Sequence, residues 1–82
     1  MSTALKQPSA AEIEVMREIW IIADPSVTVS RMLEIFSARR GWKLTTMSTI
    51  LERLTNKGFL TKNLIGNINY YTPILTETAL MH

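Results

Sequence analysis

Residues 41–73 read GWKLTTMSTILERLTNKGFLTKNLIGNINYYTP, and the spacing of their apolar side chains changes at Gly58. Before Gly58 the spacing is helical and predicts a helix from about Leu44 to Asn56, with an inner face of Met47, Ile50, Leu51 and Leu54. After it, the β-rich runs 59–62 and 68–72 flank Gly66-Asn67, a pair typical of a tight turn. This stretch therefore predicts a helix followed by a β-hairpin.

A first helix is predicted near the start of the chain. Ser9-Ala10-Ala11-Glu12 has the pattern of a capping box, in which Ser9 and Glu12 satisfy each other's backbone amides. Asp24-Pro25 is expected to stop this helix, because a residue before proline is pushed out of the α region. Its apolar stripe is expected to comprise Ile13, Met16, Ile19, Trp20 and Ala23.

A second helix is predicted after the short extended link at Val27. Thr28 is a suitable N-cap and Gly41 a suitable residue just past the C-terminus. Trp42 is expected to be a buried plug between this helix and the next. The predicted inner face comprises Val29, Met32, Leu33 and Phe36.

Three helices followed by a hairpin is the element order of a winged helix-turn-helix, a mainly α fold with a small β-hairpin of the α+β class. We expect a flexible arm at 1–8, a winged-helix domain at 9–75 and a tail at 76–82. A chain of 82 residues is long enough for one domain and one core.

The residue content argues against catalysis. The sequence has no cysteine, and its one histidine, His82, is the last residue. The carboxylates are scattered, and no catalytic triad, metal-ligand spacing or glycine-rich phosphate loop can be assembled. We therefore expect a cytoplasmic protein that is not an enzyme and needs no cofactor or metal.

Charge is concentrated in the middle of the chain. Residues 39–62 contain six basic side chains and one acidic one, whereas the net charge of the whole chain is +2. A basic block of this kind is expected of a surface that meets phosphates. The alternative is a solvated face without a partner.

The outward face of the helix at 44–56 is small and polar, which suits entry into a DNA major groove. Threonine is a mediocre helix former, so a cluster of hydroxyl residues there favours contact over plain solvation. The alternative is again a solvated face. The face comprises Thr45, Ser48, Thr49, Glu52 and Asn56, flanked by Thr46 and Arg53.

Basic side chains bracket this face, and the hairpin adds polar ones. Lys43, Arg53 and Lys57 are expected to clamp phosphates, and Lys62, Asn63 and Asn67 to contact the DNA backbone or minor groove. Leu64 and Ile65 are unusual there and are expected to pack on the domain or against a partner. Tyr70 and Tyr71 alternate, so one of them is expected in the core.

Three blocks of the chain, 11–20, 41–58 and 66–73, resemble the penicillinase-repressor/CopY family of bacterial repressors. Trp42, the pair Thr46 and Thr49, Arg53-Leu54 and Lys57-Gly58 match the recognition helix of that family. The resemblance implies a winged-helix domain that binds a palindromic DNA operator, with a separate C-terminal segment that makes the full-length protein a homodimer. The isolated domain is then expected to be monomeric.

The family has a copper-responsive branch and a β-lactam-resistance branch. Lys43-Leu44 after Trp42 is closer to the copper branch, which makes copper homeostasis (the CopY type) the preferred expectation and β-lactam resistance the alternative. Thr45, Ser48 and Asn67 stand where members of the family often have basic residues, which implies weaker non-specific binding or a different operator. A winged helix used as a protein-interaction module is the rival of another class.

Overall fold

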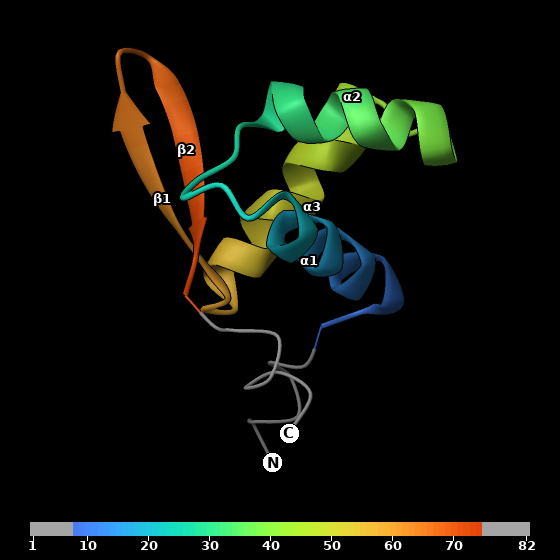
Figure 1. The fold of residues 1–82 in the computed structure, drawn as a ribbon, viewed down its shortest axis with the longest axis horizontal. Helices are drawn as coiled ribbons and strands as arrows, with labels where there is room; N and C mark the ends of the chain where they lie inside the picture. Colours follow the sequence, from blue (N-terminus) through green and yellow to red (C-terminus); the bar gives the residue numbers. More distant parts are fainter. Residues whose placement is uncertain (1–7, 75–82) are drawn as a thin grey trace.

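The computed structural model describes residues 8–74, which form three helices and a two-stranded antiparallel hairpin (Figure 1). This order confirms the predicted winged-helix fold. The predicted tail at 76–82 and all of the predicted arm except Pro8 lie outside the described residues. The elements are α1 (Ala10–Ile22), α2 (Val29–Arg40), α3 (Leu44–Asn56), β1 (Leu60–Ile65) and β2 (Ile68–Pro73).

The predicted helix caps are confirmed. The Glu12 N–H donates to Ser9 Oγ at 3.2 Å, and the Ser9 N–H donates to Glu12 Oε1 at 2.9 Å. Thr28 caps α2, and Gly41 follows it with a φ of 70°. Ala23 was expected in the apolar stripe, but it is exposed and ends α1 in the left-handed conformation, with a φ of 61°.

The buried face of α1 is rotated from the predicted stripe. Ile13 and Trp20 are only partly buried, whereas Val15 is fully buried. Glu12 shares this buried face, because Lys57 and the Ser9 N–H donate hydrogen bonds to its carboxylate. The buried residues of α1 are Glu12, Val15, Met16 and Ile19.

The core lies between the three helices and the base of the hairpin. All four predicted inward residues of α3 are buried, and Met32 and Phe36 meet them from α2. Trp42 is half-buried rather than a buried plug: its ring stacks on Phe36 at a centroid distance of 4.8 Å and covers the edge of the core.

The hairpin, called the wing below, turns at Gly66-Asn67 as predicted. Both residues have positive φ, 57° and 68°, which is the requirement of a two-residue type I′ turn. Ile65 pairs with Ile68 across this turn, so the strands are longer than predicted.

The wing is attached to the helices through β2. The N–H of Val27 donates to the carbonyl of Tyr71 at 2.9 Å, and the Tyr71 N–H donates to the Val27 carbonyl at 2.8 Å. The link between α1 and α2 therefore reaches across to β2 (Figure 1). Tyr71 is buried and Tyr70 is not, which confirms that one of the two belongs to the core.

Candidate nucleic-acid interface

The outward face of α3 divides into an open part and a part turned toward the wing. Ser48 and Glu52 are partly buried, whereas the other predicted residues of this face are exposed. Because Glu52 contacts two wing residues, that side of the helix is the one covered by the hairpin. The open part, called the reading face below, comprises Thr45, Thr46, Thr49, Arg53 and Asn56.

The N-terminus of α3 offers backbone donors beside the reading face. Lys43 is the N-cap residue and its side chain makes no capping hydrogen bond. The amides of the first turn have no acceptor within the helix, and the helix dipole favours an anion at that end. Hydroxyls from Thr45 and Thr46 lie in the same turn. This end of α3 can therefore hold a phosphate.

The basic block at 39–62 does not form one positive surface. Arg39 lies 2.7 Å from Glu18, and Arg40 lies 3.0 Å from Glu14, so both arginines tie the end of α2 to α1. Glu18 holds the pKa of Arg39 above its ordinary value. Within the described residues, four of the six cations have a carboxylate partner: Arg39, Arg40, Lys57 and Lys62.

Lys57, a predicted phosphate clamp, is paired with the buried carboxylate of Glu12. The Lys57 Nζ lies 2.7 Å from Glu12 Oε1, and the Glu12 side chain is only 2% exposed. Burial by itself would raise the pKa of Glu12, but the hydrogen bonds from Lys57 and the Ser9 N–H together hold it below its ordinary value. Lys57 therefore compensates a buried charge, and a contact with phosphate stays a prediction.

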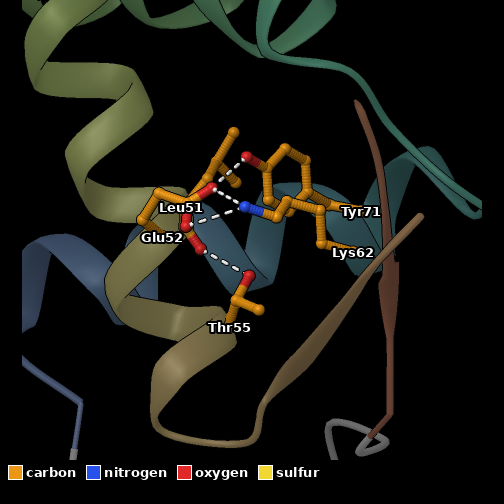
Figure 2. Close-up of polar contacts among 5 residues, drawn as sticks. All are labelled: Leu51, Glu52, Thr55, Lys62 and Tyr71. Atoms are coloured by element: carbon orange, nitrogen blue, oxygen red, sulfur yellow. Dashed lines mark hydrogen bonds and ion pairs between the residues drawn. The ribbon is translucent and has the colours of Figure 1, made fainter. Parts of the chain in front are cut away.

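Glu52 joins α3 to the wing through a cluster of polar contacts (Figure 2). The Tyr71 hydroxyl donates to Glu52 Oε2 at 2.6 Å, and Lys62 Nζ lies 2.9 Å from the same oxygen. These two donors hold the pKa of Glu52 below its ordinary value, and burial together with Glu52 raises the pKa of Tyr71. Next to them, the Thr55 hydroxyl donates to the Leu51 carbonyl at 2.8 Å.

Two of the cations predicted to contact phosphates, Lys43 and Arg53, have no carboxylate partner in the described part of the chain. Within residues 8–74, neither Lys43 nor Arg53 forms an ion pair, and both are exposed. Arg53 stands one turn beyond Thr49 on the reading face, and Lys43 stands at the start of the helix. The structure thus brings a hydroxyl-rich surface together on α3 with two cations that form no ion pair in residues 8–74, although the charge of Arg53 also helps to lower the pKa of Glu12.

The tip of the wing, residues 63–67, carries asparagines and exposed aliphatic side chains but no charged ones. Asn63 and Asn67 are exposed, as a DNA contact would require. Leu64 is 68% exposed and Ile65 is 61% exposed, so neither packs back on the described part of the domain. Contact of Leu64 and Ile65 with a partner stays a prediction.

Several contacts at this site were not predicted from the sequence. The pairing of Glu12 with Lys57 and of Glu52 with Tyr71 joins residues far apart in the chain. One signal was present in the sequence: Glu12, Val15, Met16 and Ile19 follow the i, i+3, i+4, i+7 spacing of a buried helix face.

In residues 8–74, no group of acidic, histidine or cysteine side chains could hold a metal, and no helix is long and apolar enough to cross a membrane.

Comparison with known proteins agrees with this geometry. The family model of the penicillinase repressor matches residues 8–82. The chain belongs to this family. It is 34% identical over 74 residues to the penicillinase repressor of Bacillus licheniformis, and 28% identical over 81 residues to an uncharacterized 16.5 kDa protein of Latilactobacillus sakei. These matches cover 90% and 99% of the chain but 56% and 54% of the relatives, so the chain spans about half of their length.

Two solved structures of the family share the fold. The solution structure of the DNA-binding domain of the repressor BlaI has a TM-score of 0.76 and 34% identity. The monomeric form of Bacillus licheniformis BlaI, in complex with the blaP half-operator, has a TM-score of 0.72 and 33% identity. Each comparison covers 89% of this chain and 87% of the other.

Proposed function

We propose that this chain is the operator-binding domain of a transcriptional repressor and that α3 inserts its reading face into the major groove of duplex DNA. The observation that carries the proposal is the exposed threonine surface of α3 beside Lys43 and Arg53, two cations that form no ion pair within the described part of the chain. The similar BlaI domain in complex with a half-operator supports it. A protein of this kind works in the cytoplasm, without catalysis and without a cofactor.

The two kinds of side chain have different tasks. Threonine hydroxyls can bond to base edges, and their methyl groups can pack against thymine methyls, so Thr45, Thr46 and Thr49 supply sequence preference. Lys43 and Arg53 neutralise phosphates and fix the orientation of α3 without reading sequence. The free amides at the start of α3 add a further phosphate contact.

A salt titration tests DNA binding. Each phosphate neutralised contributes about −0.9 to the slope of log K against log salt. For a mixed-sequence duplex we expect a slope of about −2 if only Lys43 and Arg53 act, rising in magnitude to about −5 if all six cations of the basic block act. Because four of the six are paired, the shallow end is expected.

Matched variants show which cations produce the salt slope. Lys43→Met together with Arg53→Met should remove most of the slope. Arg17→Met, which deletes an exposed cation on α1, should leave it nearly unchanged. A flat salt response of the parent chain would overturn the proposal.

The regulatory branch is a finer proposal. Trp42-Lys43-Leu44 supports a copper-homeostasis repressor, whereas the 34% identity to a penicillinase repressor supports the β-lactam branch as the second candidate. The blaP half-operator duplex separates the two. Under the copper proposal the chain binds it no more tightly than a mixed-sequence duplex, and a clear preference for it would favour the β-lactam branch.

The assembly state follows from the same proposal. A palindromic operator requires two copies of the reading helix, so we propose that the full-length repressor is a homodimer. The chain of 82 residues by itself is expected to sediment as a monomer, since the apolar faces of its three helices meet in one core. A dimer at micromolar concentration would contradict this and would point to the exposed Leu64 and Ile65 as an interface, which favours the rival protein-interaction module.

A further inference from the structure

The wing carries a single charged side chain, and that charge is already paired. Lys62 is the only ionisable cation between Leu60 and Pro73. Its Nζ lies 2.9 Å from Glu52 Oε2 and 3.1 Å from Glu52 Oε1, so it contacts both carboxylate oxygens (Figure 2). The wing that lies beside the reading face therefore presents no free positive charge.

Stability alone does not account for this pair. Both side chains are about two-fifths exposed, 37% for Lys62 and 41% for Glu52. Ion pairs with that exposure contribute only about 0–1 kcal/mol to folding. The hydrogen bond from Tyr71, whose ring is buried and whose backbone pairs with Val27, already holds Glu52 against the wing. The ion pair to Lys62 is thus an addition to a contact that fixes the wing without it.

The position of Glu52 gives the pair a consequence for DNA binding. Glu52 belongs to α3, one turn from Thr49 and beside the reading face, where a free carboxylate would repel phosphates. Lys62 cancels that repulsion, and Glu52 in turn occupies the ammonium group that a phosphate would otherwise take. A phosphate oxygen and a carboxylate oxygen compete for the same donor.

We propose that Glu52 is a positioning residue that holds the Lys62 ammonium group away from DNA phosphates and thereby lowers the affinity of the domain for non-cognate DNA. The inference rests on the proposed DNA-binding function. Glu52 contacts no base in this proposal, but it still contributes to specificity. When the affinity for non-cognate DNA is low, a larger part of the binding free energy comes from the reading face.

The test is a cycle of variants of the 82-residue chain, titrated against a mixed-sequence duplex. Glu52→Gln removes the charge but keeps an oxygen that accepts from Tyr71. It should make the salt slope more negative by about 0.9, so that the ratio of variant to parent affinity grows about eightfold for each tenfold fall in salt. Lys62→Met should not make the slope more negative in the parent, where it uncovers the Glu52 carboxylate, and in the Glu52→Gln background it should return the slope to the parent value.

Two controls separate this role from others. Tyr71→Phe removes a hydrogen bond of the same cluster but no charge, so it should lower the melting temperature and leave the salt slope as it is. If Glu52 acted only through its own repulsion of phosphates, the double variant would keep the full gain of Glu52→Gln over the parent instead of returning to the parent slope, and that result would overturn the inference. Binding without any salt dependence in the parent would overturn the proposed function and this inference together.

Discussion

Lys57→Met tests the buried ion pair at the end of α3. The substitution keeps most of the aliphatic stem but leaves the Glu12 carboxylate, 2% exposed, with the Ser9 N–H and the longer-range charge of Arg53 to stabilise it. Removing one partner of a fully buried pair costs roughly 3–5 kcal/mol. Because Lys57 is 25% exposed and water can take part of its place, we expect about 2 kcal/mol at neutral pH.

This loss should be visible in thermal unfolding and should depend on pH. In a domain of this size, about 2 kcal/mol lowers the melting temperature by roughly 8–16 °C. In the parent chain the pKa of Glu12 is lowered from 4.5, so its contribution to stability is present above pH 4.5 and is lost as the pH falls through the lowered pKa. Protonated Glu12 needs no cation, so the difference between variant and parent should shrink in acid.

Matched variants complete this test. Lys62→Met breaks an exposed pair instead and should cost only about 0–1 kcal/mol at every pH. Glu12→Gln in the Lys57→Met background removes the stranded charge and should restore part of the stability. A loss for Lys57→Met that equals the loss for Lys62→Met, or that does not change with pH, would refute the argument that Lys57 compensates a buried carboxylate.

Two further predictions concern the reading face and the wing. Thr49→Ala should weaken binding to the cognate duplex, one that the parent chain selects from a random library, by about 1–3 kcal/mol. It should change neither binding to a scrambled duplex nor the melting temperature. Equal losses on both duplexes would contradict a reading role for Thr49. The pKa of Tyr71 is raised above 10.0 by burial and by Glu52, so the unfolded chain loses this proton first, and stability should fall as the pH rises above about 10. Urea unfolding in alkali measures this loss, which Tyr71→Phe should diminish.

The elements could be predicted from the sequence because their signals are local. The apolar spacing of α3, the cap at Ser9 and the turn at Gly66-Asn67 each depend on residues within one or two turns of each other. The buried face of α1 was misplaced because the predicted stripe was built from apolar residues alone and left out Glu12. Glu12 is buried, since Lys57, 45 positions later, supplies the missing charge.

The site could be predicted only in part for the same reason. The period of α3 indicates which residues point outward, but which side of that face is open depends on where the wing packs, and the contact between Glu52 and Tyr71 spans 19 positions. The excess of positive charge in residues 39–62 was counted along the sequence, which does not show the acidic residues that pack against this block in the fold. In the fold, Glu14 and Glu18 of α1 pair with Arg39 and Arg40, and within residues 8–74 the cations of this block that form no ion pair are Lys43 and Arg53.

Chemical-shift mapping tests the central claim, that α3 is the DNA-reading element, most directly. The amide resonances of the 15N-labelled chain are followed while a duplex selected from a random library is added. We expect the largest shifts for Thr45, Thr46, Thr49 and Arg53, smaller ones along the wing, and little change for the exposed residues Arg17 and Ile21 of α1. Shifts confined to α1 or to the tip at Leu64 and Ile65, with α3 unmoved, would contradict this claim.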